Sequence, residues 1–267
     1  MRVCLVQYDI VWNHPSVNLQ RLEELLKGVD GVDAVVMPEM FSTGFVTDVS
    51  QLSDDAAERS LNWMRRQAAL KGATLLGSMP VKEAGRYYNR LYVVRPDGSS
   101  EHYDKRHLFS YGGEQRHYAP GQERVVVELG GLRCLLQVCY DLRFPVFSRN
   151  RCDYDAIVYV ANWPTSRLEV WRTLLKARAI ENQCYVVGVN RCGRDPLCEY
   201  AGSSAAIDAY GRVMSEAGTD SQEVITVDLP LEPLQAFRRK FPVLADADSF
   251  SLLFSTINDK KQEPIYE

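Results

Sequence analysis

The chain has 267 residues, 46% of them hydrophobic and 25% charged, which is the composition of a globular protein with a large core. Its net charge of -4, with both signs spread along the chain, excludes a basic field for nucleic acid or acidic lipid. No apolar run reaches the length of about 18 residues that indicates a membrane span. The opening MRVCLVQYDIVW lacks the long apolar region of a signal peptide, so we expect a cytoplasmic protein.

The first half of the chain alternates strand and helix patterns. Apolar residues from Leu19 to Val29 recur at the helical period of about 3.6 residues. In the second helix, Asp55 followed by Glu58 is typical of a capping box, and Gly72 is expected to end the helix. The predicted elements are strand 3–10, helix 19–29, strand 34–39, helix 54–72, strands 73–81 and 90–98, and a strand pair over 124–139 joined at Gly130-Gly131.

The second half becomes richer in strands. Residues 140–150 are expected to be mainly irregular. The predicted elements are strand 155–162, helix 166–183, strands 184–190, 204–214 and 223–229, and a basic helix over Leu231 to Lys240. This pattern predicts a single α/β domain over residues 1–254, with helices covering the sheet faces, and a polar tail at 255–267.

Seven cysteines are present, an odd number without any C-x-x-C pair. Cys184, Cys192 and Cys198 have no histidine near them, so we expect no metal site. Unpaired thiols are typical of a reducing compartment. The chain also lacks a G-x-G-x-x-G after its first strand and a G-x-x-x-x-G-K-[ST], so no nucleotide cofactor is expected.

Side chains that can take part in catalysis follow several predicted strands, and this is the edge of the sheet where α/β proteins place their functional groups. Glu39 ends one strand, Lys105 and Glu114 flank the loop YDKRHLFSYGGE, and Cys139 ends the apolar LLQV. Asn162-Trp163-Pro164 ends the strand 155–162. Each alone has a structural explanation, as a solvated strand end, a charged loop or a core cysteine. Together they supply what nucleophilic catalysis needs: a thiol, a base and a cation.

The histidines do not supply the base in this pattern. His14, His102, His107 and His117 all precede Cys139, and none lies at a predicted strand end, which argues against a papain-like protease. No cysteine begins a phosphatase-type C-x5-R. Carboxylates remain as candidate bases, and a lysine remains as the candidate cation.

Three motifs in this order resemble a known family. Glu39 in VVMPEMFSTGF, Lys105 in YDKRHLF and Cys139 in VCYDLRFP are similar to the Glu-Lys-Cys triad of the nitrilase, or carbon-nitrogen hydrolase, superfamily. The resemblance extends over nearly the whole chain, and YVANWP and ARAIENQ resemble the bacterial omega-amidase (YafV-like) branch most. Glu114 in GGEQRHYAPG matches a second glutamate of many members.

The resemblance implies a four-layer α-β-β-α sandwich that pairs into a homodimer, and an amidase without a cofactor. Glu39 would take the proton of Cys139, whose sulfur would attack an amide carbonyl to form a thioester. Lys105 and the backbone N–H of Tyr140 would hold the oxyanion. Glu114 would orient its neighbours; a loop salt bridge is an equal alternative.

A terminal amide of a small keto acid, such as alpha-ketoglutaramate, is the substrate that the resemblance implies. Arg143 is a candidate for its carboxylate, and a buried ion pair with Asp141 or another nearby acid is an equal alternative. Further candidates are Arg167 and Arg172. Pocket walls are expected from Phe45, Tyr111 and Trp163, which as core aromatics would need no such role.

Other functions stay open. The same triad can act on a nitrile, on a carbamoyl group, or on an acyl chain passed to an amine. From a different class, Cys139 can serve a redox sensor, or the fold can be an idle scaffold. The filled triad speaks against the scaffold. A sensor needs a resolving thiol, and Cys134 would face the opposite side of its strand.

Overall fold

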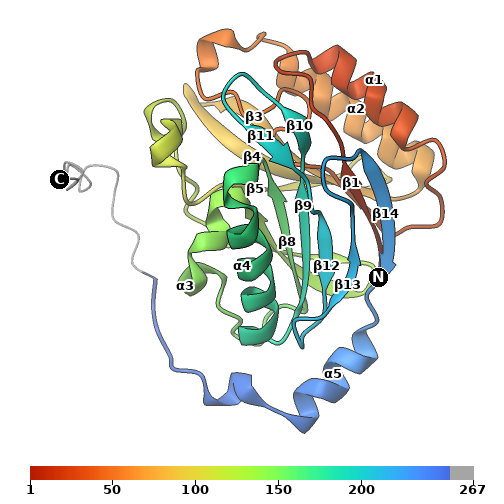
Figure 1. Cartoon of the computed structure of the whole chain (residues 1–267), viewed down its shortest axis with the longest axis vertical. Helices are drawn as coiled ribbons and strands as arrows, with labels where there is room; N and C mark the ends of the chain where they lie inside the picture. The colour runs from red at the N-terminus through yellow and green to blue at the C-terminus, as the bar shows by residue number, and fades with distance from the viewer. Residues whose placement is uncertain (253–267) are drawn as a thin grey trace.

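A computed structural model describes residues 1–252, which form two six-stranded sheets packed face to face with helices on the outer faces. In Figure 1, α1 and α2 lie together on one side of the molecule and α4 lies on the other. The first sheet has the order β14-β1-β2-β3-β4-β5 and the second has the order β13-β12-β9-β8-β7-β6. The expected four-layer α-β-β-α sandwich is therefore confirmed.

The elements of the first half-sandwich are β1 (Arg2–Gln7), α1 (Pro15–Leu25), β2 (Ala34–Val36), α2 (Ala56–Lys71), β3 (Thr74–Glu83), β4 (Arg86–Val94), β5 (Ser100–Asp104) and β14 (Glu223–Asp228). Those of the second are β6 (Val126–Leu129), β7 (Leu132–Val138), α3 (Pro145–Ser148), β8 (Ala156–Ala161), α4 (Leu168–Glu181), β9 (Tyr185–Asn190), β12 (Ala205–Ile207) and β13 (Val213–Glu216). A small hairpin, β10 (Cys192–Arg194) with β11 (Glu199–Ala201), and helix α5 (Leu231–Lys240) complete the described chain.

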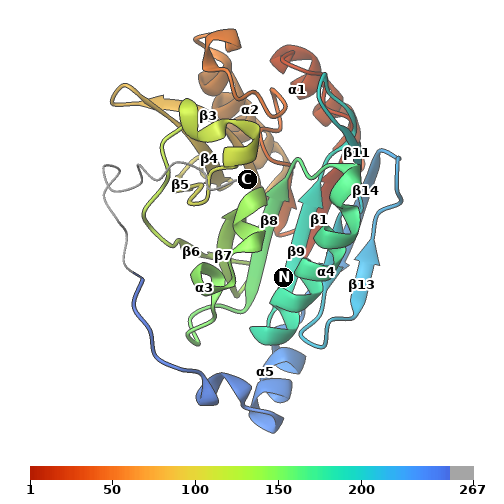
Figure 2. The ribbon, with the colours of Figure 1, turned by 60° about the vertical axis from the view of Figure 1, so that its left-hand side comes forward.

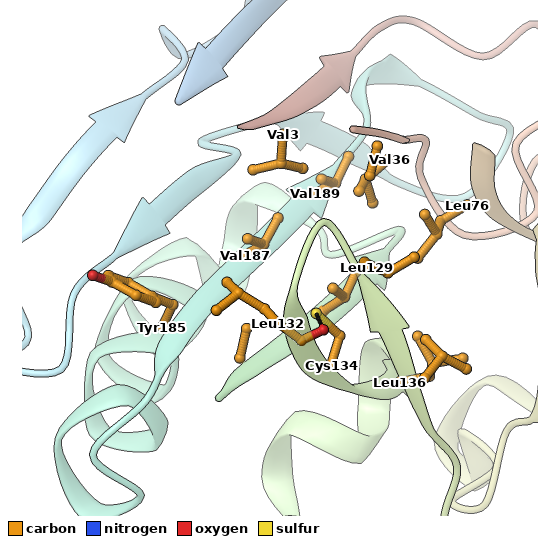
Figure 3. Packing of buried hydrophobic residues seen from close by; sticks show 14 of the residues in the cluster. Val3, Val36, Leu76, Leu129, Leu132, Cys134, Leu136, Tyr185, Val187 and Val189 are labelled. Carbon is orange, nitrogen blue, oxygen red and sulfur yellow. Dashed lines mark hydrogen bonds between the residues drawn. The ribbon is translucent and has the colours of Figure 1, made fainter. Parts of the chain in front are cut away.

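Side-chain alternation along the central strands creates three apolar layers. Val3 of β1 faces the layer between the sheets, whereas Cys4 faces α1 and α2. Val158 of β8 likewise faces the layer between the sheets, and Ile157 packs under α4. Figure 3 shows the central layer, with Val3 opposite side chains of the second sheet, and Figure 2 shows α4 lying along β8 and β9. Strands buried on both faces explain the uninterrupted apolar runs.

Parallel pairing brings functional strand ends to one edge. β7 and β8 are parallel neighbours, with Val138 opposite Val160, so the residues that follow both strands emerge side by side. β2 is parallel to β1 and β3 in the facing sheet. The segments that leave β2, β7 and β8 therefore carry Glu39, Cys139 and Asn162 into one region.

Several local predictions were wrong. The span 204–214 is two strands, because the Asp208 carboxylate accepts hydrogen bonds from Tyr210 N and Arg212 N, both at 2.9 Å, and closes a turn with Gly211 at φ +78°. Residues 140–150 are largely helical, with a 3₁₀ helix, η4 (Cys139–Arg143), followed by α3. The strand β5 and the hairpin β10–β11 had not been predicted.

Helices α2, α4 and α5 begin and end within two residues of the predicted positions, whereas α1 lies four residues earlier than predicted at both ends. α1 starts at Pro15, four residues before the first predicted helical leucine, since proline is well suited to a first helical turn. Asp55 precedes α2, but its side chain accepts no hydrogen bond from the helix backbone and contacts Arg59 at 2.8 Å instead, so the predicted capping box is absent. Gly72 ends α2 in the left-handed conformation, as expected.

Two further predictions concern the C-terminal tail and membrane-spanning segments. The predicted tail at 255–267 lies outside the described residues. Within residues 1–252, no helix has both the length and the apolar character needed to cross a bilayer.

Candidate active site

Lys105 lies between two buried glutamates. Its Nζ is 2.8 Å from Glu39 Oε1 and 2.9 Å from Glu114 Oε2, and all three side chains are almost completely inaccessible to water. Lys105 follows the end of β5, whereas Glu114 begins the 3₁₀ helix η3 (Glu114–Arg116) of the same loop. The loop is closed by Glu114 itself, whose Oε2 accepts a hydrogen bond from Phe109 N at 2.6 Å. The loop salt bridge and the cluster with Glu39 are thus one arrangement.

Two asparagines hold Glu39 from opposite sides. Asn89 Nδ2 donates to Glu39 Oε1 at 2.8 Å and to Glu114 Oε1 at 3.1 Å. Asn162 donates its backbone N–H to Glu39 Oε2 at 2.9 Å and its Nδ2 to the backbone oxygen of Glu39 at 2.7 Å. Together with Lys105 Nζ and a 3.3 Å contact from Asn162 Nδ2 to Oε2, these make four donors to a carboxylate that has no exposed surface.

Cys139 begins η4 directly after β7, with a positive φ of 46°. A non-glycine residue in this region is strained, and such strain gathers at functional turns. The turn is held by Asp141, which is buried and accepts from Val138 N at 2.9 Å and from Tyr103 Oη at 2.8 Å. Cys139 itself is half-buried, with Sγ 3.9 Å from the backbone oxygen of Asn162.

Burial is the largest influence on the pKa of the Cys139 thiol. Burial raises the pKa of the Cys139 thiol well above its ordinary value; Glu39 raises it further, against the opposing effect of Lys105. Burial also raises the pKa of Glu114, and Lys105 works against that rise. For Lys105 itself, burial disfavours the charge, but the two carboxylates outweigh it and its pKa is raised. A thiol in this setting needs a base to become a nucleophile.

Aromatic rings line one side of this cluster. The Phe45 ring is 5.3 Å from Lys105 Nζ, and its centroid is 6.3 Å from that of Phe109. The Phe109 ring contacts two further rings, with its centroid 5.1 Å from that of Tyr140 and 5.9 Å from that of Tyr111. Tyr111 is 88% exposed, so it lies at the outer end of this group and not against the glutamates.

Trp163 and two arginines form a second side. Trp163 is buried at 3% exposure, and the guanidinium of the exposed Arg143 lies 5.2 Å from its ring centroid. The Asp141 carboxylate accepts from other groups, and within residues 1–252 Arg143 makes no ion pair. Arg167 lies over Phe109 at 5.6 Å, whereas Arg172 is engaged by Glu169 and Glu216, each at 3.2 Å.

Three neighbours of the cluster had not been predicted as site residues: Asn89, Asn162 and Phe109. Asn162 was noted only as a strand end. Asn89 sits inside β4, where asparagine is disfavoured, and that local conflict is a usable signal. Nothing in the sequence singles out Phe109, because its role depends on the folding of its loop.

The described residues contain no cluster of histidine, cysteine, aspartate and glutamate side chains suited to a metal ion. A cavity of about 680 Å³ lies elsewhere, beside α3 and residues 243–251. None of the predicted site residues lines it.

Comparison with known proteins gives the same family over most of the chain. Residues 2–239 match the family model described as carbon-nitrogen hydrolase. An omega-amidase YafV from Yersinia enterocolitica is 44% identical over 95% of this chain and 99% of its own. A 2-oxoglutaramate amidase from Bacillus subtilis is 32% identical over 91% of this chain and 96% of its own. A similar solved structure is the crystal structure of XC1258 from Xanthomonas campestris, a CN-hydrolase superfamily protein with an arsenic adduct in the active site. It superposes with a TM-score of 0.87, is 41% identical, and the match covers 94% of this chain and 98% of that one.

Proposed function

The chain belongs to the carbon-nitrogen hydrolase family, and we propose that it hydrolyses the terminal amide of a small omega-amido keto acid, of the alpha-ketoglutaramate type, to acid and ammonia. The observation that carries this proposal is the buried contact of Glu39, Lys105 and Glu114 beside the half-buried Cys139. The names of the omega-amidase and 2-oxoglutaramate amidase relatives support the choice of substrate.

In the first step, Glu39 removes the proton of Cys139 as the sulfur attacks the amide carbonyl. The raised pKa of the thiol supports a proton transfer coupled to the attack, because little free thiolate exists beforehand. Collapse of the tetrahedral intermediate breaks the C–N bond, and the protonated Glu39 returns its proton to the leaving ammonia. A thioester on Cys139 remains.

The oxyanion of that intermediate meets two donors. The Lys105 ammonium donates to Glu39 Oε1 at 2.8 Å and to Glu114 Oε2 at 2.9 Å, and its longer contact, to Glu114 Oε1 at 3.2 Å, is the one that gives way to the oxyanion. The backbone N–H of Tyr140 lies in the first turn of η4, where amides have no partner within the helix. Glu114 orients Lys105 in this scheme.

Hydrolysis of the thioester repeats the sequence with water. Glu39, again a carboxylate, takes a proton from water as its oxygen attacks the thioester carbonyl. The C–S bond then breaks, the proton passes to the Cys139 sulfur, and the free acid leaves. No cofactor enters the scheme.

We further propose that Arg143 binds the carboxylate of the keto acid. Its guanidinium is exposed, stacks on Trp163, and has no acidic partner within the described chain. Trp163 and Phe45 would form apolar walls for the short carbon chain, with Tyr111 at the outer rim. Arg172 is a poorer candidate because two glutamates already engage it.

A panel of amides assayed for ammonia tests the proposal. Alpha-ketoglutaramate is expected to be hydrolysed, and Cys139→Ala is expected to abolish its turnover. An aliphatic nitrile and a neutral amide of similar length serve as alternatives. Turnover of the nitrile but of no keto-acid amide would remove the omega-amidase assignment and leave the family unaffected.

We also propose a cytoplasmic homodimer. All seven cysteines are free, which supports a reducing compartment. Exposed apolar side chains at the end of α4 and near α5, among them Ile180, Tyr210 and Phe241, support burial against a second copy. Light scattering coupled to size exclusion would give twice the chain mass; a monomer at micromolar concentration would contradict the proposal.

A further inference from the structure

Both carboxylate oxygens of Glu39 are already occupied by protein donors. Oε1 accepts from Lys105 Nζ and from Asn89 Nδ2, both at 2.8 Å. Oε2 accepts from Asn162 N at 2.9 Å and from Asn162 Nδ2 at 3.3 Å. Lys105 is charged, and Asn162 also contacts Cys139 and the backbone of Glu39. Asn89 is neutral and makes neither of these two contacts.

Asn89 links the two glutamates of the cluster. Its Nδ2 also donates to Glu114 Oε1 at 3.1 Å, and Lys105 Nζ contacts the same two Oε1 atoms. The result is a closed ring of hydrogen bonds in which Asn89 and Lys105 alternate with the two carboxylates. Asn89 has no exposed surface, and its backbone oxygen accepts from Lys105 N at 2.9 Å.

An amide is well suited to this position for a physical reason. Its two N–H groups diverge from one nitrogen at a fixed angle, so it binds two carboxylates at a set separation without adding charge. Each such hydrogen bond favours the ionised form of its acceptor. The like charges of Glu39 and Glu114 repel, and Lys105 alone cannot fix both their distance and their orientation.

We infer that Asn89 is a positioning residue for the reaction, which holds the Glu39 carboxylate in place through a hydrogen-bond donor that it shares with Glu114. The inference rests on the proposed function, since it takes Glu39 as the base. Asn89 acts through Glu39, and its own Oδ1 is buried without a hydrogen-bond partner among the described residues.

The charged and titratable groups that face Glu39 come from several elements. They are Lys105 after β5, Glu114 in η3, Cys139 in η4 and, more distantly, Tyr118. None of them changes in an Asn89 variant. A shift in the pH profile of that variant is therefore traceable to the lost amide.

The test compares Asn89→Leu with the parent protein on the keto-acid amide across pH. We expect kcat/KM at pH 7 to fall about 10- to 100-fold, mostly in kcat, because a hydrogen bond to a charged base is lost. The acid limb of kcat/KM should move up by about one pH unit or more, since loss of a hydrogen bond to a carboxylate favours its protonated form. An unchanged limb with kcat/KM within about threefold of the parent would overturn the inference.

A matched control separates positioning from packing. Asn182 is also a buried asparagine, and it accepts from Asn150 N at 2.9 Å, far from the cluster in sequence and contacts. Asn182→Leu should lower the melting temperature and leave the pH profile unchanged. If Asn89→Leu does not fold, Asn89→Ser, which is smaller and whose hydroxyl reaches at most one glutamate, replaces it with the same expected shift.

A substrate-free measurement keeps the inference separate from the proposed function. Iodoacetamide alkylation of Cys139, followed by peptide mass spectrometry across pH, reports the apparent acid limb of the Glu39–Cys139 pair. That limb should shift upward in Asn89→Leu, as for turnover. If the parent hydrolyses no amide, the proposed function fails; an unshifted alkylation limb in the folded variant would overturn the inference alone.

Discussion

Replacing Lys105 by methionine removes the ammonium that lies between Glu39 and Glu114. Both carboxylates are buried at 0% exposure in the parent protein, so the variant would leave them without their cationic partner. Breaking a buried ion pair by removal of one member costs about 3–5 kcal/mol. For a domain of this size, that loss corresponds to a melting temperature lower by about 6–20 °C. Turnover should fall at least about 10²-fold, because an oxyanion donor is lost as well.

The second substitution, Glu114→Gln, separates the two effects. In Lys105→Met/Glu114→Gln, one uncompensated charge is gone, so about half or more of the lost stability should return. Activity should not return, since the oxyanion donor is still missing. Turnover of the keto-acid amide and thermal unfolding of the four proteins of this cycle provide the measurement.

The stability of Lys105→Met should also depend on pH in a definite direction. Burial already raises the pKa of Glu114, and loss of Lys105 removes the influence that lowers it. The folded variant then holds a proton that the unfolded chain has released, so its stability falls as pH rises through the Glu114 pKa. The melting temperature should drop less at pH 5 than at pH 8. Equal losses at both pH values, or a double variant no more stable than Lys105→Met, would refute the reasoning.

Other substitutions test separate parts of the structure. Arg143→Gln should raise KM for the keto-acid amide about tenfold or more and leave a neutral amide unaffected in steady-state kinetics; equal effects on both amides would contradict carboxylate binding. Iodoacetamide should label both Cys139 and the exposed Cys152 and abolish activity, and in a Cys152→Ser background the loss of activity should match the fraction of Cys139 labelled; retained activity after full labelling of Cys139 would contradict the nucleophile assignment. Gly188→Ala should destabilise the fold by about 1–3 kcal/mol in denaturant titration, because its Cβ would meet Leu175 Cδ1 at 2.7 Å; an unchanged midpoint would mean that the layer under α4 adapts.

The redox-sensor alternative loses its resolving thiol in this structure. Cys134 lies in the layer between the sheets with no exposed surface, and burial raises its pKa to about 12. A disulfide with Cys139 would need a reactive thiolate at this buried position.

Features that depend on residues close together in the sequence were predictable from the sequence alone. The apolar runs of 34–36 and 156–161 required strands buried on two sides, and both became central strands. Gly72 ended its helix because only a left-handed residue closes that turn. The errors at Asp55 and at 204–214 arose where an aspartate side chain takes a different local partner: Arg59, four residues along the chain, for Asp55, and the backbone N–H groups of the turn for Asp208.

The residues by themselves determined which chemistry the protein carries: a thiol, two carboxylates and a lysine that follow buried strands or lie in the loop after one. Composition and motif order settled this, because reactive groups at strand ends are a local property of the chain. Only the tertiary structure decided that Lys105 meets both glutamates, that Asn89 and Asn162 saturate Glu39, and that Arg143 has no acidic partner among the described residues. Those contacts join β4 to the segments that follow β2, β5 and β8, separated by up to 123 residues, and such distances carry no signal in a local pattern.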